Sequence, residues 1–371
     1  MQSSMKKILL VTRPICPPWD EASKNFAYYL AQNISGHEFH LLTHGMIGGL
    51  HANIVQHPIY SSAHLSLGQK ANLLKLIPLK KTVDIFHFML TPNALNTFAF
   101  KKLLSNKTLR TIQTIATLRE DIYADEQLKK ILFADHIITY SDHAKQKLES
   151  LGITKVTRIY PGIDLHKYTP APKDADALSL FGIVPEDFVV TYPGEYTRLG
   201  ATDAIVASLP KLFKRIPHAK FVFANRVKNE KDALKKQEVV RTLTEQNILN
   251  KVIFTDTFAD MPKIYNLSDV VVFPVRDMHG KFDVPLAVIE AFACEKPVVI
   301  SDIPILAEFA KPDNSVIMEN GNFSQFVDEI VALSTDPGRR SILGKNARAF
   351  TQKHFDIKEV AQKYTTVYDK I

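Results

Sequence analysis

Residues 282–302 read FDVPLAVIEAFACEKPVVISD, and this stretch decides the expected fold. Pro285 suits the first turn of a helix, and an apolar helical segment follows it. Residues 298–300 form a short β-branched run that ends on the polar Ser301. A buried helix that leads directly into a buried strand is typical of a parallel α/β sheet.

Glu290 is the one acidic residue inside this apolar helix. An ionised carboxylate on an apolar surface needs a partner, because burying it alone costs more than a hydrogen bond returns. A pair of ligand hydroxyls, such as those of a ribose, is a simple partner. Alternatively, Glu290 faces solvent or caps a neighbouring loop.

Strand-like and helix-like segments alternate along the whole chain. The strand-like runs lack a polar–apolar alternation, which favours parallel sheets covered by helices on both faces. Residues 168–177 (YTPAPKDADA) interrupt the pattern and are typical of a linker. We therefore predict two successive doubly wound α/β domains at residues 1–168 and 178–352, with a final helix at residues 353–371.

The amino-acid composition excludes several classes of protein. The chain has 371 residues, 46% of them hydrophobic and 23% charged, as in ordinary globular proteins. No apolar run reaches the roughly 20 residues that span a bilayer. Cys16 and Cys294 are the only cysteines, which indicates a reducing compartment and no metal site. A GxGxxG after the first strand and a GxxxxGK[ST] are both absent, so a dinucleotide site is not expected.

The positive charge is uneven. Residues 1–165 hold 19 Lys and Arg against 12 Asp and Glu, whereas the remainder holds 27 of each. The excess favours an anionic partner for the first half, such as a membrane surface or a phosphate-bearing acceptor, or it is a solvated basic face. Residues 65–81 (LSLGQKANLLKLIPLKK) fit a helix on an anionic membrane or an amphipathic helix that covers the sheet.

Several motifs together resemble the retaining nucleotide-sugar glycosyltransferases of family 4, which have the two-domain GT-B architecture. They are residues 16–25 (CPPWDEASKN), 160–164 (YPGID), 168–170 (YTP), 192–200 (YPGEYTRLG), 261–274 (MPKIYNLSDVVVFP) and the segment around Glu290. The resemblance implies two Rossmann-like domains facing a central cleft, an acceptor-side first domain and a final helix that packs back on it.

The resemblance also implies roles for residues 282–290. Glu290 would bind the ribose hydroxyls of the donor, and the backbone N–H groups at the helix start would hold a phosphate. Phe282, Val284 and Pro285 would line the same site. The family often has a glutamate where Phe282 stands. Asp283 either supplies that carboxylate for the transferred sugar, on the same helix face as Glu290, or caps the helix.

The predicted donor loop follows Tyr192. The family often has an arginine directly after the glycine, whereas Glu195 follows Gly194 here. Arg198 is then the expected contact of the diphosphate, unless it is an exposed loop charge. Arg226 is a second candidate.

In the first domain, many relatives have a histidine near the reacting centre, and Ala116 stands at that position. His87, at a strand end, is the alternative, with either a catalytic or a structural role. Further residues are expected near the acceptor or the diphosphate: Glu21, Ser23, Asn25 and Arg119.

These patterns predict a retaining glycosyltransferase whose donor is a nucleoside diphosphate sugar. A glycosyltransferase-like binding or partner subunit that has lost catalysis is the alternative, and a sugar-nucleotide epimerase is a weaker one. We expect no cofactor, metal or nucleic acid, and a glycan or lipid-linked acceptor. The expected location is the cytoplasm, with peripheral contact at the inner face of the membrane through the basic first domain.

Overall fold

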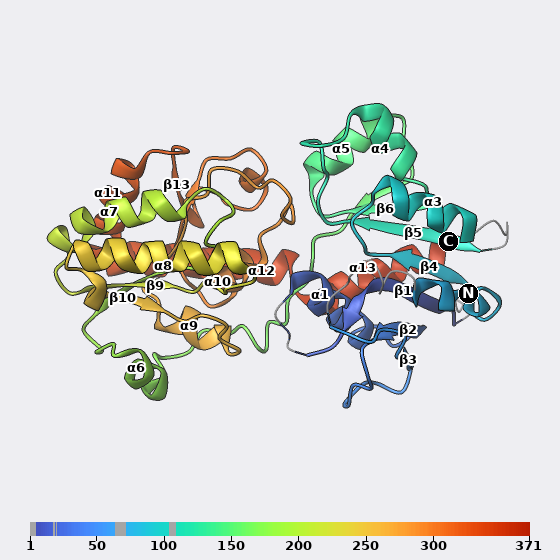
Figure 1. Cartoon of the computed structure of the whole chain (residues 1–371), viewed down its shortest axis with the longest axis horizontal. Coiled ribbons are helices and arrows are strands. Elements are labelled where there is room, and N and C mark those ends of the chain that lie inside the picture. The colour runs from blue at the N-terminus through green and yellow to red at the C-terminus, as the bar shows by residue number, and fades with distance from the viewer. Residues whose placement is uncertain (1–4, 18, 20, 64–71, 104–108) are drawn as a thin grey trace. The chain divides into compact units, whose positions relative to one another are not determined.

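The computed structural model describes residues 5–17, 19, 21–63, 72–103 and 109–371 (Figure 1). The chain divides into two compact units. Unit 1 comprises Met1–Ile163, Gly280–Val284 and Phe355–Ile371, and unit 2 comprises Asp164–His279 and Pro285–His354.

Unit 1 is built on a seven-stranded parallel sheet of order β3-β2-β1-β4-β5-β6-β7. Strand β4 is wholly buried and its neighbours β1 and β5 are buried over most of their length, as expected for a sheet covered on both faces. The strands are β1 (Lys7–Ile15), β2 (Glu38–Thr43), β3 (Ile54–His57), β4 (Ile85–Phe88), β5 (Arg110–Ile115), β6 (His136–Thr139) and β7 (Val156–Arg158).

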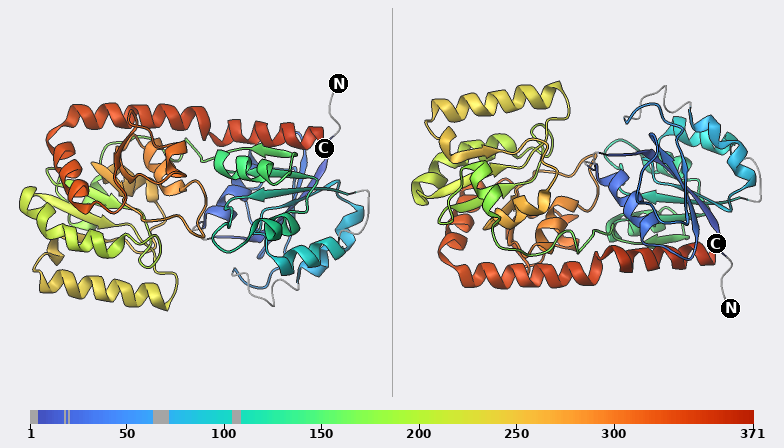
Figure 2. Two further views of the ribbon diagram at one scale, coloured as in Figure 1. Left: turned by 90° about the horizontal axis from the view of Figure 1, so that it is seen from above. Right: turned by 90° about the horizontal axis from the view of Figure 1, so that it is seen from below.

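The sheet of unit 1 is covered by five helices and two short 3₁₀ turns in the described ranges. The helices are α1 (Ala22–Gln32), α3 (Ala94–Leu103), α4 (Asp125–Ile131), α5 (Asp142–Ser150) and α13 (Ile357–Lys370), and the turns are η1 (Asn72–Leu76) and η2 (Pro78–Lys81). Helix α13 lies along the sheet (Figure 2). Its side chains Tyr364 and Tyr368 are fully buried. Gly162 lies so close to Ile357 that a Cβ on it would be 2.7 Å from that side chain.

Unit 2 has a six-stranded parallel sheet of order β10-β9-β8-β11-β12-β13. The strands are β8 (Phe188–Tyr192), β9 (Ala219–Phe223), β10 (Val252–Phe254), β11 (Val270–Phe273), β12 (Val298–Ser301) and β13 (Ser315–Met318). The order of strands along each sheet is that of a Rossmann-like fold, so both predicted doubly wound units are present.

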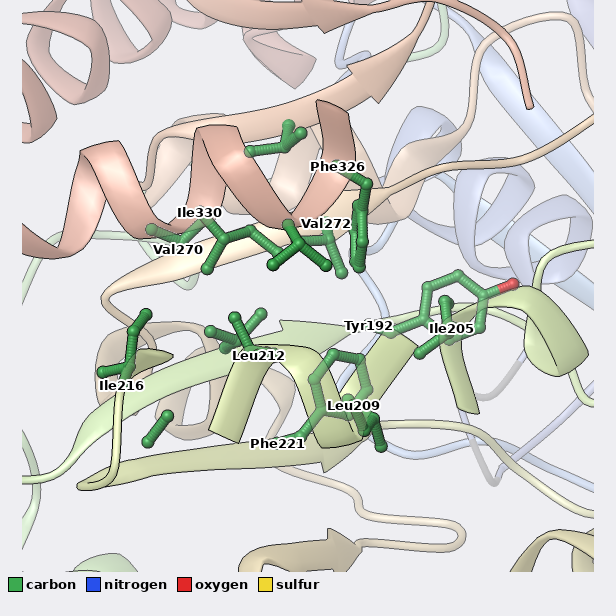
Figure 3. Packing of buried hydrophobic residues seen from close by; sticks show 14 of the residues in the cluster. Tyr192, Ile205, Leu209, Leu212, Ile216, Phe221, Val270, Val272, Phe326 and Ile330 are labelled. Carbon is green, nitrogen blue, oxygen red and sulfur yellow. The ribbon is translucent and has the colours of Figure 1, made fainter. Parts of the chain in front are cut away.

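The helices of unit 2 are α6 (Ala175–Phe181), α7 (Thr202–Arg215), α8 (Glu230–Glu245), α9 (Met261–Leu267), α10 (Leu286–Ala293), α11 (Phe323–Thr335) and α12 (Pro337–His354), with 3₁₀ turns η3 (Leu249–Lys251) and η4 (Leu306–Glu308). Helix α7 places Ile205, Leu209 and Leu212 at helical spacing on one face, where they pack on the sheet beside Phe326 and Ile330 of α11 (Figure 3). This core fixes the positions of the strand ends that carry the candidate site.

Some sequence predictions differ from the structure. Residues 168–177, predicted as a linker, are tied to unit 2, because Asn266 accepts a hydrogen bond from Ala171 and Lys173 pairs with Asp269 at 2.9 Å. Residues 64–71, the first part of the predicted helix 65–81, lie outside the described residues. After them the chain forms two 3₁₀ turns, with Leu76 buried and Ile77 exposed. No helix in the described part of the chain is long and apolar enough to cross a membrane.

Candidate functional site

The strand order of unit 2 reverses between β8 and β11, which are neighbours in the sheet. Crevices outside the carboxyl ends of parallel strands at such a switch point are the usual ligand sites of doubly wound folds. The loop that follows β8 begins with Pro193, Gly194 and Glu195, and the loop that follows β11 contains Arg276. This edge of unit 2 is therefore the candidate site.

The packing around residue 194 leaves room only for a glycine. A Cβ at this position would lie 1.9 Å from Cζ of Tyr192, whose ring is fully buried. The backbone N–H of Gly194 donates to Oδ1 of Asn225 over 3.0 Å, and Asn225 is also fully buried. The Nδ2 group of Asn225 has no hydrogen-bond partner among the described residues. A buried donor without a partner is uncommon in folded proteins, so this amide is available to a ligand or a water.

Glu195 is paired rather than isolated. Its carboxylate forms an ion pair with Nζ of Lys228, and its carbonyl accepts from Oγ1 of Thr202 at 3.1 Å. Lys228 therefore offsets the negative charge that stands where the family often has an arginine. Lys228 was not predicted from the sequence, because it follows β9 and is 33 positions from Glu195. Arg226, from the same segment, is half-buried.

Two arginines belong to the loops at this edge. Arg198 is exposed and forms no ion pair within the part of the chain that the structure describes. Arg276 was not predicted; its backbone N–H donates to the carbonyl of Leu199 at 2.8 Å, and its side chain packs over Gly200. Gly200 has a φ of +65°, and a Cβ there would lie 3.1 Å from Cδ of Arg276. The close approach holds Arg276 beside the donor loop.

Glu290 lies in the second turn of α10 and is half-buried. Its Oε2 accepts a hydrogen bond from the hydroxyl of Tyr265 at 3.0 Å. Burial raises the pKa of Glu290 to about 7, while hydrogen bonds from Tyr168 and Tyr265 and the charge of Lys167 oppose that rise. The carboxyl group therefore has protein partners and does not point into bulk water. At neutral pH it changes readily between its charged and neutral forms.

Asp283 lies outside α10, so the prediction that it shares a helix face with Glu290 is wrong. Pro285 is the N-cap residue, with no side-chain cap, and the helix begins at Leu286. The alternative prediction, Asp283 as cap of this helix, is therefore wrong too. Asp283 is buried instead in unit 1, where its Oδ2 accepts from Oγ of Ser141 at 2.6 Å.

The whole segment Gly280–Val284 belongs to unit 1. The backbone N–H of Asp283 donates to the carbonyl of Ala116 at 2.9 Å, and Thr117 donates to the carbonyl of Lys281. The ring of Phe282 packs edge-on against Tyr140, 5.6 Å between centroids. Val284 is buried. These contacts explain why residues 282–284 do not continue α10 toward its N-terminus.

His87 is fully buried in β4 of unit 1. Its Nδ1 lies 2.8 Å from the hydroxyl of Tyr368 and its Nε2 lies 2.7 Å from Oγ1 of Thr114. Burial lowers the pKa of His87 to about 3, so the ring is neutral at neutral pH. Both ring nitrogens are occupied by side chains of the core, and this geometry favours the structural interpretation over the catalytic one.

The other predicted residues of unit 1 lie near α1 and after β5. Glu21 is the N-cap residue of α1 and pairs with Arg13 at 3.2 Å. Asn25 donates to the carbonyl of Trp19 at 3.1 Å, and its Oδ1 is buried without a hydrogen-bond partner among the described residues. Ser23 is half-buried in the first turn of α1.

Arg119 follows β5 and Ala116. It forms a bidentate pair with Asp121, with both N–O distances at 2.8 Å. Its guanidinium also lies beside Gly280, because a Cβ on that glycine would be 3.8 Å from Cζ of Arg119. Arg119 therefore lies next to the segment of unit 1 that holds Asp283. No group of three or more His, Cys, Asp or Glu side chains in the described ranges could hold a metal ion.

Two family models match consecutive parts of the chain. "Glycosyltransferase Family 4" matches residues 23–167, and "Glycosyl transferases group 1" matches residues 187–336. Among curated relatives, the chain is 22% identical over 264 residues to D-inositol 3-phosphate glycosyltransferase of Segniliparus rotundus, which covers 66% of this chain and 57% of that protein. The enzyme of the same name from Rhodococcus erythropolis is 26% identical over 58% of this chain and 50% of its own length. The chain thus spans about half the length of the curated relatives it matches.

Solved structures agree over the full length. Anabaena Alr3699/HepE, in complex with UDP-glucose, matches with a TM-score of 0.76 at 16% identity, over 99% of this chain and 100% of that chain. Sucrose-phosphate synthase from Thermosynechococcus elongatus matches with a TM-score of 0.78 at 17% identity, over 99% and 98% of the two chains. These likenesses confirm the predicted GT-B fold class. Since the two family models together cover most of the sequence, the chain belongs to the group 1, family 4 glycosyltransferases.

Proposed function

We propose that this protein transfers a glycosyl group from a nucleoside diphosphate sugar to an acceptor, with the nucleotide held at the carboxyl edge of the sheet in unit 2. The two family models support this function. The solved complexes of HepE with UDP and UDP-glucose support a nucleotide-sugar donor. We therefore take UDP-glucose as the first donor to test.

Glu290 carries the proposal. A half-buried carboxyl group with a pKa of about 7, on the helix that connects the neighbouring strands β11 and β12, is a perturbed group of the kind that clusters at functional sites. We assign it to the two ribose hydroxyls, which would donate to its ionised form. Tyr265 holds the side chain in place through its 3.0 Å hydrogen bond.

We assign binding of the diphosphate to the cationic side chains of the loops after β8, β9 and β11. Arg198 and Arg276 are exposed arginines at this edge, and the planar guanidinium group suits bidentate contact with phosphate. Gly194 lets a ligand approach the backbone without a Cβ in the way. Arg226 adds positive charge, and Lys228 neutralises Glu195. Stabilising the departing diphosphate is the main electrostatic task of this site, and these cations perform it without a metal.

For the stereochemistry we propose retention, in which the acceptor attacks on the face that the diphosphate leaves and the leaving phosphate takes the acceptor proton. No general base is then needed, which agrees with the buried position of His87. Ser23, Asn25, Glu21 and Arg119 of unit 1 are proposed as contacts of the acceptor. Asp283 is proposed to position its loop through Ser141.

The acceptor is proposed to be a glycan or a lipid-linked sugar, met in the cytoplasm or at the inner face of a membrane. A catalytically impaired binding subunit is the second candidate, and one observation favours it. The carboxylate of Glu195 occupies the donor loop, where it repels a diphosphate unless Lys228 stays paired with it.

Thermal unfolding in the presence of UDP and UDP-glucose tests the donor site. A ligand at 100 times its dissociation constant stabilises the native state by about 2.7 kcal/mol. Glu290→Ala is expected to abolish that shift, whereas Glu245→Ala, a change at an exposed residue of α8, keeps it. An unchanged affinity in Glu290→Ala refutes the ribose assignment. Slow hydrolysis of UDP-glucose by the wild-type protein distinguishes an enzyme from a binding subunit.

A further inference from the structure

Unit 1 has an open cavity of about 700 Å³. Its lining comes from the amino ends of β5 and β6, from β7 and the residues beside it, and from helix α13. Ligands of doubly wound sheets bind at the carboxyl ends of the strands, so this cavity is at the opposite edge of the sheet. Its volume lies in the range of small-molecule sites.

The lining of this cavity is strongly basic. Five cationic side chains contribute to it, namely Arg110, Lys155, Arg158, Lys363 and Lys370. Asp135 is the one acidic side chain among the lining residues, and its Oδ2 is held by the N–H and hydroxyl of Thr111 at 2.9 and 2.8 Å.

Most of these cations have no counter-ion in the protein. Arg158 pairs with Asp142 at 3.1 Å. Arg110, Lys155, Lys363 and Lys370 form no ion pair with any residue that the structure describes. Positive groups gathered without partners repel one another, which a bound anion would relieve.

The cations come from two elements that lie far apart in the chain. Lys363, Thr366, Val367 and Lys370 lie at spacings of three, four and seven residues, so they form one face of α13. The facing strand ends are in parallel register, with Ile112 beside His136 and Ile137 beside Val156. This packing brings Arg110 and Lys155 to the same edge as the helix face.

The positive charges around the cavity act on the side chain of His136. Its Nε2 lies 3.0 Å from Oγ1 of Thr157, and both residues line the cavity. The pKa of His136 is lowered mainly by burial, and in addition by the positive charges of Lys155 and Lys370. The two ammonium groups, one from the strand end and one from the helix, therefore act on the same ring.

We propose that this cavity binds a phosphate-bearing ligand that carries at least two negative charges. Arginine and lysine side chains with the hydroxyls of Thr157 and Thr366 provide the donors that phosphate oxygens accept. The ligand is a soluble phosphate compound or the headgroup of an anionic lipid, and both present the same chemistry. The inference does not depend on the proposed donor site.

Two probes separate these sources. Tripolyphosphate binding is measured by calorimetry against sodium sulfate at equal ionic strength. Vesicle binding is measured by co-sedimentation with phosphatidic acid, whose phosphomonoester carries up to two negative charges, mixed into phosphatidylcholine. The test variant is Lys363→Glu with Lys370→Glu, both exposed on α13. The matched control is Lys102→Glu with Lys130→Glu, which changes the net charge equally at exposed residues of unit 1 outside the cavity.

The test variant is expected to weaken binding by about tenfold or more, because two charged contacts are lost, and the control by less than about threefold. Tripolyphosphate binding with this dependence supports a soluble ligand, and vesicle binding with the same dependence supports a lipid headgroup. Absence of binding to both probes overturns the proposal, as does equal weakening in the two variants. Loss of UDP-glucose binding in Glu290→Ala leaves these outcomes unaffected.

Discussion

The hydroxyl of Ser141 donates a 2.6 Å hydrogen bond to the buried carboxylate of Asp283, 142 positions away in the chain. Ser141 is also the N-cap residue of α5, where its Oγ accepts from the backbone N–H of Ala144 at 3.0 Å. One hydroxyl thus starts a helix and holds the segment that precedes α10. This relationship separates Asp283 from the helix that carries Glu290.

Ser141→Ala removes both interactions. We expect it to destabilise unit 1 by about 2–4 kcal/mol, since a lost cap costs about 1 kcal/mol and a lost partner of a buried charged group costs about 1–3 kcal/mol. Calorimetric unfolding measures the change. Asn229→Ala, which removes the side-chain cap of α8 alone, should cost only about 1 kcal/mol. Similar losses in the two variants would mean that the bond to Asp283 adds nothing.

Gly194→Ala places a methyl group on the ring of Tyr192, and the buried ring has no room to move. The donor loop must shift, at a cost of about 1–3 kcal/mol. We expect a lower unfolding temperature and UDP-glucose binding weakened by about tenfold or more, measured by calorimetry. Gly36→Ala is the control, because a Cβ at Gly36 meets no atom within 4 Å. Normal binding by Gly194→Ala would exclude this loop from the donor site.

Glu290 predicts an unusual pH dependence of stability. Its pKa is about 7 in the folded protein and 4.5 for an unperturbed glutamate, so the native state binds more protons than the unfolded state between these values. Stability therefore falls as the pH rises from about 4.5 to 7, by a total on the order of 3 kcal/mol. Glu290→Gln should remove this slope, so that the variant is more stable than the wild type at pH 8 and the difference shrinks toward pH 5.

The protonation state of Glu290 also governs ligand binding if its carboxylate accepts hydrogen bonds from the ribose hydroxyls. UDP-glucose affinity should then rise between pH 6 and 8 in the wild type, because only the ionised form accepts two hydroxyl donors. Isothermal titration at several pH values measures this. An equally flat profile in wild type and Glu290→Gln would contradict the assignment. Burial raises the pKa of the neighbouring Tyr265 and Cys294, so neither group titrates in this range.

The burial of His87 leads us to expect that the protein loses stability in acid. Its pKa is lowered from 6.5 to about 3 by burial, so the unfolded state binds more protons between these values. Stability is retained above pH 6.5 and falls as the pH drops toward 3, by an amount on the order of 4–5 kcal/mol. His87→Gln should reduce this slope in acid unfolding experiments. Burial also lowers the pKa of His37, His57 and His136, so part of the slope remains. An unaltered slope would show that His87 binds its proton equally in the folded and unfolded states.

Much of the fold could be predicted from local patterns. The runs Phe188–Tyr192 and Val298–Ser301 are wholly buried strands, as their lack of polar alternation indicates. Strand Ile54–His57 was missed, because only its first two residues are apolar and it lies half-exposed at the sheet edge. Helix Asp125–Ile131 was missed as well, since it has only two buried residues.

Likewise, some residues of the candidate site could be predicted from local sequence motifs and others could not. Gly194, Arg198 and Glu290 were proposed as site residues from the sequence, since each lies within a short motif next to a recognisable strand or helix, and these roles stay predictions. Lys228 and Arg276 were not found, because each reaches the donor loop from a different strand end. Asp283 was given the wrong surroundings, since a sequence does not say which unit a residue packs against. For His87 the sequence left a catalytic and a structural role open, and its buried hydrogen bonds favour the structural one.

The amino-acid sequence by itself determined two parallel α/β units, their family and an acidic residue on an apolar helix. Hydrophobic periodicity and short motifs are local properties, and they persist wherever the segments lie. Only the tertiary structure decided that Asp283 joins Ser141, that His87 is enclosed by Tyr368, and that α13 meets the ends of β5 to β7 to form a basic cavity. These contacts join residues more than a hundred positions apart, and their geometry follows from how the sheet and helices pack.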